Sequence, residues 1–137
     1  PKGGGPSLLV AAGPAGQLGV VTSGDRVQPG DSVQAGYTTT RDGFGAVLAK
    51  DGAGHVMAYV PSRGDALVAL PAGTTRSFPE STVLDATLGE EQLVVVWCEA
   101  VRPLAPLLGE LAAQGTVTAP AGCTVHRVIL HKRITAP

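Results

Sequence analysis

Short valine-rich segments, separated by turns of glycine and proline, follow one another along nearly the whole of this 137-residue chain. No other feature of the sequence constrains the fold as strongly. The 19 glycines and 11 prolines interrupt the chain too often for long helices. Short strands between evenly spaced turn signals are typical of an all-β sandwich or barrel. We therefore predict a mostly-β protein built as an antiparallel sandwich.

The clearest pair of strands is a hairpin around the turn Asp51–Gly54. Residues 44–50 and 55–60 flank this turn, and its two glycines supply the positive φ angles that a tight turn needs. Pro61 ends the second strand because it has no N–H for the ladder. Other strand candidates are residues 7–12, 17–22, 33–37, 66–70, 82–85 and 123–132.

The segment Leu93–Cys98 is apolar at every position. Because alternate residues of a strand face opposite sides, such a strand needs cover on both faces and belongs in the centre of the protein. The residues that follow place four leucines on one helical stripe: Leu104, Leu107, Leu108 and Leu111. We predict one short helix, over about residues 103–114, with Gly115 as its C-terminal cap. This helix is expected to cap the sandwich.

The only two cysteines, Cys98 and Cys123, stand at the ends of two apolar runs. If these runs are neighbouring strands, the two Cα atoms come within disulfide reach, about 4.4–6.8 Å. The bridge would close a loop of about 25 residues and stabilise the fold by roughly 3–4 kcal/mol. We expect this disulfide, and with it an oxidising compartment. The alternative is a pair of buried thiols in a cytosolic protein.

The chain fits one domain, with Pro1–Pro6 as a flexible Gly-rich tether and residues 7–134 as the sandwich. The formal net charge of −1 argues against a nucleic-acid partner, which normally meets a basic stripe. It also argues against a polybasic membrane anchor. No apolar run approaches the roughly 18 residues of a membrane span. Any membrane contact would therefore come through a tether outside this chain.

No set of side chains in the sequence has the spacing of a catalytic or metal site. A Gly-x-Ser-x-Gly nucleophile elbow is absent, and Cys98 lies in an apolar run, where a thiol is inert. Successive candidate metal ligands fall on opposite faces of the last strand: Cys123, His126 and His131. We expect a non-enzymatic protein without metal or cofactor. An enzyme whose pocket forms only on folding is a third alternative.

The adjacent carboxylates Glu90 and Glu91 follow Gly89, and we place them in a solvated turn. General acid–base catalysis needs two carboxyl groups that face each other across a cleft. Neighbouring residues in an extended turn point apart instead. The pair is therefore expected to be exposed and without a chemical role.

Aromatic residues make up only 4% of the chain, and most of them fall into one expected cluster: Tyr37, Phe44, Tyr59 and Trp97. Trp97 on a central strand, next to a cysteine, is similar to the core of an immunoglobulin-like sandwich. The alternative is a platform on which a ligand stacks. The candidate contacts for a ligand or partner are Tyr37, Tyr59, and the hairpin tip with Asp51 and His55.

Residues 7–98 resemble a domain of unknown function found in Gram-negative envelope proteins. The motifs are Ser7-Leu8-Leu9-Val10, Ser23-Gly24-Asp25-Arg26-Val27-Gln28-Pro29-Gly30-Asp31, Gly43-Phe44-Gly45-Ala46-Val47-Leu48, Asp51-Gly52-Ala53-Gly54-His55-Val56, Tyr59-Val60-Pro61, Leu70-Pro71-Ala72-Gly73 and Leu84-Asp85-Ala86-Thr87-Leu88-Gly89. The chain departs from the family pattern at Val60, where a second aromatic residue is common. This departure counts against a ligand platform.

The resemblance implies an immunoglobulin-like sandwich outside the cytoplasm, appended to kinases, peptidase-like domains or anti-sigma-factor-like membrane proteins. The helix and the cysteine pair resemble a subgroup that follows a single transmembrane helix. The first expected function is a periplasmic sensing or protein-interaction domain of a membrane-tethered signalling protein, with a protein or a small envelope ligand as its partner. The alternative is a structural or assembly subunit that associates through its edge strands.

Overall fold

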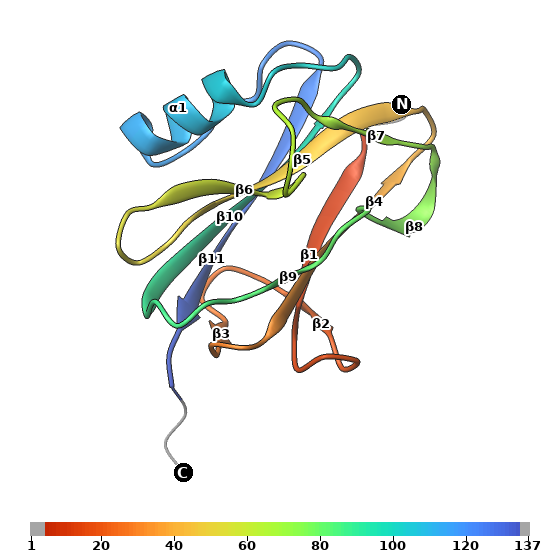
Figure 1. Cartoon of the computed structure of the whole chain (residues 1–137). Coiled ribbons are helices and arrows are strands. Elements are labelled where there is room, and N and C mark those ends of the chain that lie inside the picture. The colour runs from red at the N-terminus through yellow and green to blue at the C-terminus, as the bar shows by residue number, and fades with distance from the viewer. Residues whose placement is uncertain (1–4, 135–137) are drawn as a thin grey trace.

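Two β-sheets lie face to face in the computed structural model, which describes residues 5–134 (Figure 1). Sheet A has five strands, in the order β2 (Gly19–Val21), β1 (Ser7–Gly13), β4 (Ser32–Thr39) and β8 (Gly73–Ser77), with β9 (Thr82–Val83) also paired to β4. Sheet B has six, in the order β3 (Arg26–Val27), β11 (Cys123–Lys132), β10 (Gly89–Cys98), β5 (Gly43–Lys50) and β6 (Val56–Val60), with β7 (Val68–Leu70) also paired to β5. The helix is α1 (Ala105–Gln114). The predicted mostly-β sandwich with one short helix is confirmed.

The strand order is that of an immunoglobulin-like sandwich. In such domains strands A, B and E are neighbours in one sheet, and G, F, C and C′ in the other. Here β1, β4 and β8 take the first set of places, and β11, β10, β5 and β6 take the second. Each of these pairs is antiparallel, whereas the short β3 pairs with β11 in parallel.

The core between the sheets is built from alternate residues of the long strands. On β10, Leu93, Val95 and Trp97 face inward, and each is at most 1% exposed. They meet inward residues of sheet A such as Val10 and Tyr37. Trp97 is therefore a core residue, and the alternative of a stacking platform for a ligand is wrong.

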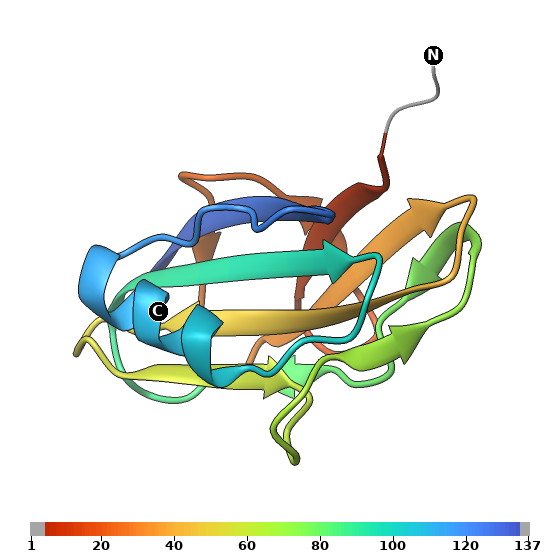
Figure 2. The same ribbon diagram turned by 90° about the horizontal axis from the view of Figure 1, so that it is seen from above.

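The opposite side of β10 is buried beneath the helix. Val94, Val96 and Cys98 form a second apolar cluster with α1, which contributes Leu107 and Leu111. Figure 2 shows α1 outside sheet B, on the side away from sheet A. The prediction that this strand is covered on both faces is confirmed. The cap is confirmed as well, because Gly115 ends the helix in the left-handed conformation, at φ 72°.

Most of the expected strands are present with altered ends. Residues 7–12 and 17–22 do form a hairpin, although β2 is limited to Gly19–Val21. β10 begins earlier than expected, at Gly89. β3 and β8 were not predicted, since β3 is very short and the exposed sequence of β8, GTTRS, lacks alternating apolar residues. Of the proposed tether, residues 1–4 lie outside the described part of the chain.

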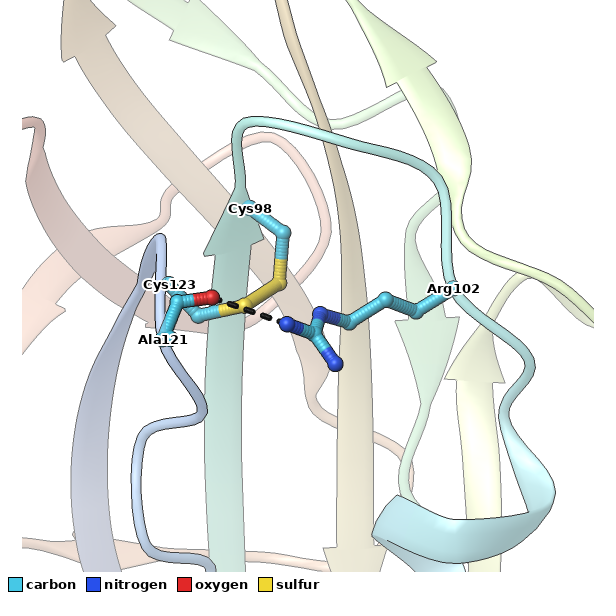
Figure 3. Close-up of a disulfide and its surroundings, with 4 residues drawn as sticks. All are labelled: Cys98, Arg102, Ala121 and Cys123. Atoms are coloured by element: carbon cyan, nitrogen blue, oxygen red, sulfur yellow. Dashed lines mark hydrogen bonds between the residues drawn. A yellow bond between two sulfur atoms is a disulfide. The ribbon is translucent and has the colours of Figure 1, made fainter.

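Cys98 and Cys123 are directly opposed on β10 and β11 and form a disulfide (Figure 3). Their Cα atoms are 4.0 Å apart, closer than the expected range, because the two residues are a cross-strand pair. In antibody domains the disulfide joins the two sheets. Here it joins neighbouring strands of one sheet, on the helix side, while Trp97 faces the other side. The predicted bridge is confirmed.

The loops beside the disulfide are tied to each other. In Figure 3 the guanidinium of Arg102, from the segment before α1, donates a hydrogen bond of 2.8 Å to the carbonyl of Ala121. The N–H of Glu99 donates to the carbonyl of Gly122 at 2.9 Å. The covalent bridge and these hydrogen bonds together fix the end of sheet B from which the helix departs.

Candidate functional site

The helix covers only part of the outer face of sheet B. A ten-residue helix is about 15 Å long, whereas a ten-residue strand such as β10 extends about 33 Å. Beyond the helix the outward positions become polar, with Glu90 and Gln92 on β10, Lys50 on β5 and Arg127 on β11. They line a groove of about 560 Å³, which we call the polar groove, together with Asp51, Gly52, Gly54, Gln114 and Gly115.

Gln92 forms the floor of the polar groove and is 9% exposed. Its side-chain amide donates a hydrogen bond of 2.7 Å to the carbonyl of Gly115, at the end of α1. Its carbonyl oxygen accepts a longer one, 3.4 Å, from the guanidinium of Arg127. One buried amide thus connects the helix end to β10 and orients a cation at the groove wall.

The β5–β6 hairpin forms the second wall. The Asp51 carboxylate is buried, and one of its oxygens accepts hydrogen bonds of 2.9 Å from the N–H groups of Ala53 and His55. Gly52 lies against the segment before β10, where a β-carbon would stand 2.1 Å from the carbonyl oxygen of Leu88. The Asp51 carboxylate therefore stabilises the hairpin that forms this wall.

The charges at the rim of the polar groove are available to a ligand. Across residues 5–134, no ion pair includes Lys50, Glu90 or Arg127. The side-chain amide of Gln114 also lines the groove and is exposed. The cations Lys50 and Arg127, the carboxylate of Glu90 and the amide of Gln114 can therefore contact a ligand in place of water.

The four predicted contact residues do not come together at one place. Asp51 lines the polar groove, and His55 follows it on the same hairpin with a 75% exposed side chain, its Nδ1 lying 3.4 Å from an Asp51 oxygen. Tyr37 is 2% exposed and lies between the sheets, where its hydroxyl donates a 2.7 Å hydrogen bond to the carbonyl of Pro71. Burial raises the pKa of Tyr37. This leaves Tyr37 no surface to offer a partner.

Tyr59 belongs to a buried polar network inside the sandwich. Its hydroxyl donates to one oxygen of Glu91, and the ammonium of Lys132 donates to the other oxygen at 2.9 Å. The same ammonium lies 2.7 Å from the carboxylate of Asp85. Glu91 is fully buried and Lys132 is 1% exposed. The solvated turn expected for Glu91 is wrong, because β10 already begins at Gly89 and directs this carboxylate inward.

The protonation states of this network follow from its contacts. Burial, the hydrogen bond to Glu91 and nearby negative charges all raise the pKa of Tyr59. Burial alone would lower the pKa of Lys132, but its hydrogen bonds to Asp85 and Glu91 outweigh that effect and raise it. The hydrogen bond from Lys132 lowers the pKa of Asp85. Both oxygens of Glu91 are engaged, and the network connects β6, β10 and β11 with the loop that carries Asp85.

The side chains that could bind a metal are scattered in the described part of the chain. Within residues 5–134, no three His, Cys, Asp or Glu side chains are grouped so that they could hold a metal ion. In the same range, no helix has the length and apolar character to cross a bilayer. Both cysteine sulfurs are consumed by the disulfide.

Sequence reasoning missed the residues that define the polar groove, namely Lys50, Gln92 and Arg127, and assigned Glu90 no role. A signal was present, since Glu90 and Gln92 continue the outward side of the apolar run Leu93–Cys98 with polar residues. It could not show where the helix would stop covering the sheet. Comparison of the chain with protein-family models, with curated proteins and with solved structures finds no match.

Proposed function

We propose that this chain is a non-catalytic binding domain outside the cytoplasm, carried by a membrane-tethered bacterial signalling protein, with the polar groove as its ligand site. The observation that carries this proposal is the combination of free charges of both signs over a floor held by Gln92. A volume of about 560 Å³ lies within the range of small-molecule sites, roughly 300–1,000 Å³.

The location outside the cytoplasm rests on the Cys98–Cys123 disulfide. Disulfides form and persist in oxidising compartments and are rare in reducing ones. The resemblance of residues 7–98 to a Gram-negative envelope domain favours the periplasm among those compartments. The same resemblance supplies the expected attachment to a signalling protein.

A binding role fits the state of the reactive groups better than catalysis does. The buried carboxylates of Asp51 and Glu91 are engaged in internal hydrogen bonds, and the two sulfurs are bonded to each other. The groups that remain free, at the polar groove, are suited to hold a ligand by charge. A bound ligand would act on the tethered protein through its different affinity for two states of that protein.

The proposal is tested by NMR titration of the ¹⁵N-labelled chain with the low-molecular-mass fraction of a bacterial envelope extract. We expect saturable shifts confined to the amides around the polar groove, among them Gln92 and Gly115. The same titration of Gln92→Leu, which removes the floor amide, is expected to lose those shifts while the rest of the spectrum stays folded. Shifts spread over other faces, or no shifts at all, would contradict the proposal.

A second candidate function, assembly of copies of this chain, is favoured by the outer face of sheet A. The outward positions of this sheet carry no charged residue: Ser7, Leu9, Ala11, Val20, Ser32, Gln34, Gly36, Thr38, Ser77 and Val83. Val20 is 66% exposed and Val83 is 65% exposed. Leu9 lies flat over Gly36, where a β-carbon would be 3.0 Å from its side chain. The solvent-facing side of an antiparallel sheet normally carries polar and charged residues, whereas the core of a protein–protein interface is depleted in charged residues.

The size of this face fits a weak contact with a second copy of the chain. With strands about 4.8 Å apart and residues rising about 3.3 Å, the seven residues of β1, the eight of β4 and the shorter β2, β8 and β9 give a face of roughly 400 Å². Two such faces packed on each other bury about 800 Å², which is the size of a transient association. An uncharged face meets no charge repulsion when it packs on the same face of a second copy across a twofold axis. The sequence predicts assembly through edge strands. The outer face of sheet A is a different surface for the same function.

A further inference from the structure

We infer that the polar groove binds a short peptide with a free amine and a free carboxylate, with Glu90 facing the ammonium and Lys50 and Arg127 facing the carboxylate. The inference rests on the proposed function and gives that site a ligand class. It goes beyond the general binding role, because it states which two chemical groups a ligand must carry and which side chains recognise each of them.

The first argument is the balance of charge at the rim. Lys50 and Arg127 carry positive charge, and Glu90 carries the one carboxylate that is not already held by the hairpin. A simple anion would satisfy the cations and leave its charge near Glu90. A neutral sugar could hydrogen-bond to the three charged groups but would neutralise none of their charges. A ligand with charges of both signs compensates the charge of every group.

The second argument is distance. Lys50 lies opposite Gln92 on the neighbouring strand, and Arg127 lies opposite Val94. With strands about 4.8 Å apart and residues rising about 3.3 Å, the Cα of Glu90 is roughly 8 Å from that of Lys50 and roughly 14 Å from that of Arg127. An extended dipeptide or tripeptide spans about 7–10 Å. The side chains of Lys50 and Arg127 are long enough to close the remaining gap.

The third argument is the chemistry between the charged ends. The exposed amide of Gln114 and the backbone of Gly52 also line the groove, and both offer hydrogen-bond donors and acceptors. A peptide bond needs one donor and one acceptor of this kind. Gln92 keeps its own amide engaged with Gly115 and Arg127, so it holds the site in shape and leaves recognition to the rim.

The test uses the whole chain and four probes: alanyl-alanine, its N-acetyl form, its C-terminal amide and inorganic phosphate. By isothermal calorimetry or NMR, we expect alanyl-alanine to bind with about millimolar affinity or tighter. Blocking either terminus removes a charge-assisted contact and is expected to weaken binding about tenfold. Phosphate is expected to bind more weakly than alanyl-alanine.

Two variants test which side chain binds the amine of the ligand and which binds its carboxylate. Glu90→Gln is expected to weaken alanyl-alanine about tenfold, whereas the anionic N-acetyl form should bind equally well or more tightly. Arg127→Gln is expected to weaken alanyl-alanine, whereas the cationic amide form should bind equally well or more tightly. The matched controls are Glu99→Gln, directly after the far end of β10, and Arg63→Gln, in an exposed loop, and neither should change any affinity. The thermal midpoint of each variant shows that it remains folded.

Equal binding of alanyl-alanine and its blocked forms would overturn the inference, as would phosphate binding more tightly than the peptide. No binding of alanyl-alanine at its highest soluble concentration would also overturn it. If an envelope extract still shifts the groove amides in that case, the proposed binding function stands and the ligand belongs to another class. If the extract gives no shifts either, the proposed function fails as well.

Discussion

The indole ring of Trp97 lies directly against the backbone of Gly43, where a β-carbon would stand 2.3 Å from the ring. Trp97 is the largest fully buried side chain of the described residues, and the guanidinium carbon of Arg41 lies 5.5 Å from its ring centroid. The core at this end of the sandwich therefore depends on a residue without a side chain. Gly43 is required here for space.

Replacing Gly43 with alanine is expected to destabilise the protein by about 1–3 kcal/mol, because the methyl group would push the indole out of its packed position. Urea denaturation followed by tryptophan fluorescence measures the loss. The matched control is Gly109→Ala, inside α1, where the added methyl group meets open space. That change should stabilise the fold by up to about 1 kcal/mol. Equal effects of the two substitutions would show that the contact with Trp97 is unimportant.

Removing the disulfide through Cys98→Ala and Cys123→Ala is expected to lower the free energy of unfolding by roughly 3–4 kcal/mol. The bridge closes a loop with a sequence separation of 25, which restricts the unfolded chain. Adding a reductant to the wild type should produce a similar loss and should not affect the double variant. Titration of the denatured, unreduced protein should find no free thiols. Two reactive thiols would exclude the bridge in the protein as isolated.

Substituting Lys132 with methionine is expected to cost about 3–5 kcal/mol, because the fully buried Glu91 carboxylate loses its compensating charge. The double variant Lys132→Met, Glu91→Gln should recover a large part of this loss. Glutamine is neutral and can still accept the hydrogen bond from Tyr59. Chemical denaturation of the four proteins in a double-mutant cycle measures the coupling. A double variant that simply adds the two single effects would argue against a functional ion pair.

The network also predicts an acid-dependent loss of stability. Its hydrogen bond from Lys132 lowers the pKa of Asp85 in the folded state below the ordinary value near 3.8. A lowered carboxyl pKa stabilises the fold above the unfolded pKa, and this contribution disappears as the pH falls through the folded pKa. Asp85→Asn should therefore be less stable than the wild type at neutral pH, and the difference should shrink at about pH 3. Thermal midpoints of both proteins across this range are the measurement. A constant difference would exclude this linkage.

If copies of the chain associate through sheet A, a charge on its outer face should separate them. Val20→Lys places an ammonium at a 66% exposed position in that face and is expected to shift light-scattering mass from dimer to monomer. Val101→Lys, at an exposed apolar position outside sheet A, is the control and should not change the mass. A wild type that stays monomeric at high concentration would rule out this second function.

The central elements of the fold could be predicted because their patterns are local. The uninterrupted apolar run Leu93–Cys98 requires cover on both faces, and the leucines after it have helical spacing, so the sequence itself contains both the strand and its cover. The disulfide follows from the sequence only on the condition that the two apolar runs are neighbouring strands. Glu91 shows where such reasoning fails, because Gly89 predicts a turn there, whereas the Glu91 side chain is the first of β10 to point inward.

The partners of the polar residues could not be predicted, because they depend on which strands become neighbours. Lys132 is separated from Glu91 by 41 residues, and Tyr59 by 32. Strand periodicity indicates which face a residue takes, but not which distant residue shares that face. The exposed apolar positions of sheet A were hidden for the same reason, since Val20 and Val83 belong to short strands far apart in sequence.

The alternation of apolar residues and the chemistry of the turns determined a layered β-sandwich, a central strand buried on both faces and a single helix. These features depend on short-range steric and hydrophobic preferences that each segment carries with it. The tertiary structure alone decided the polar groove and the buried network of Glu91 and Lys132. Both arise because α1 is shorter than the strands it covers and because the sheet order brings distant charges together.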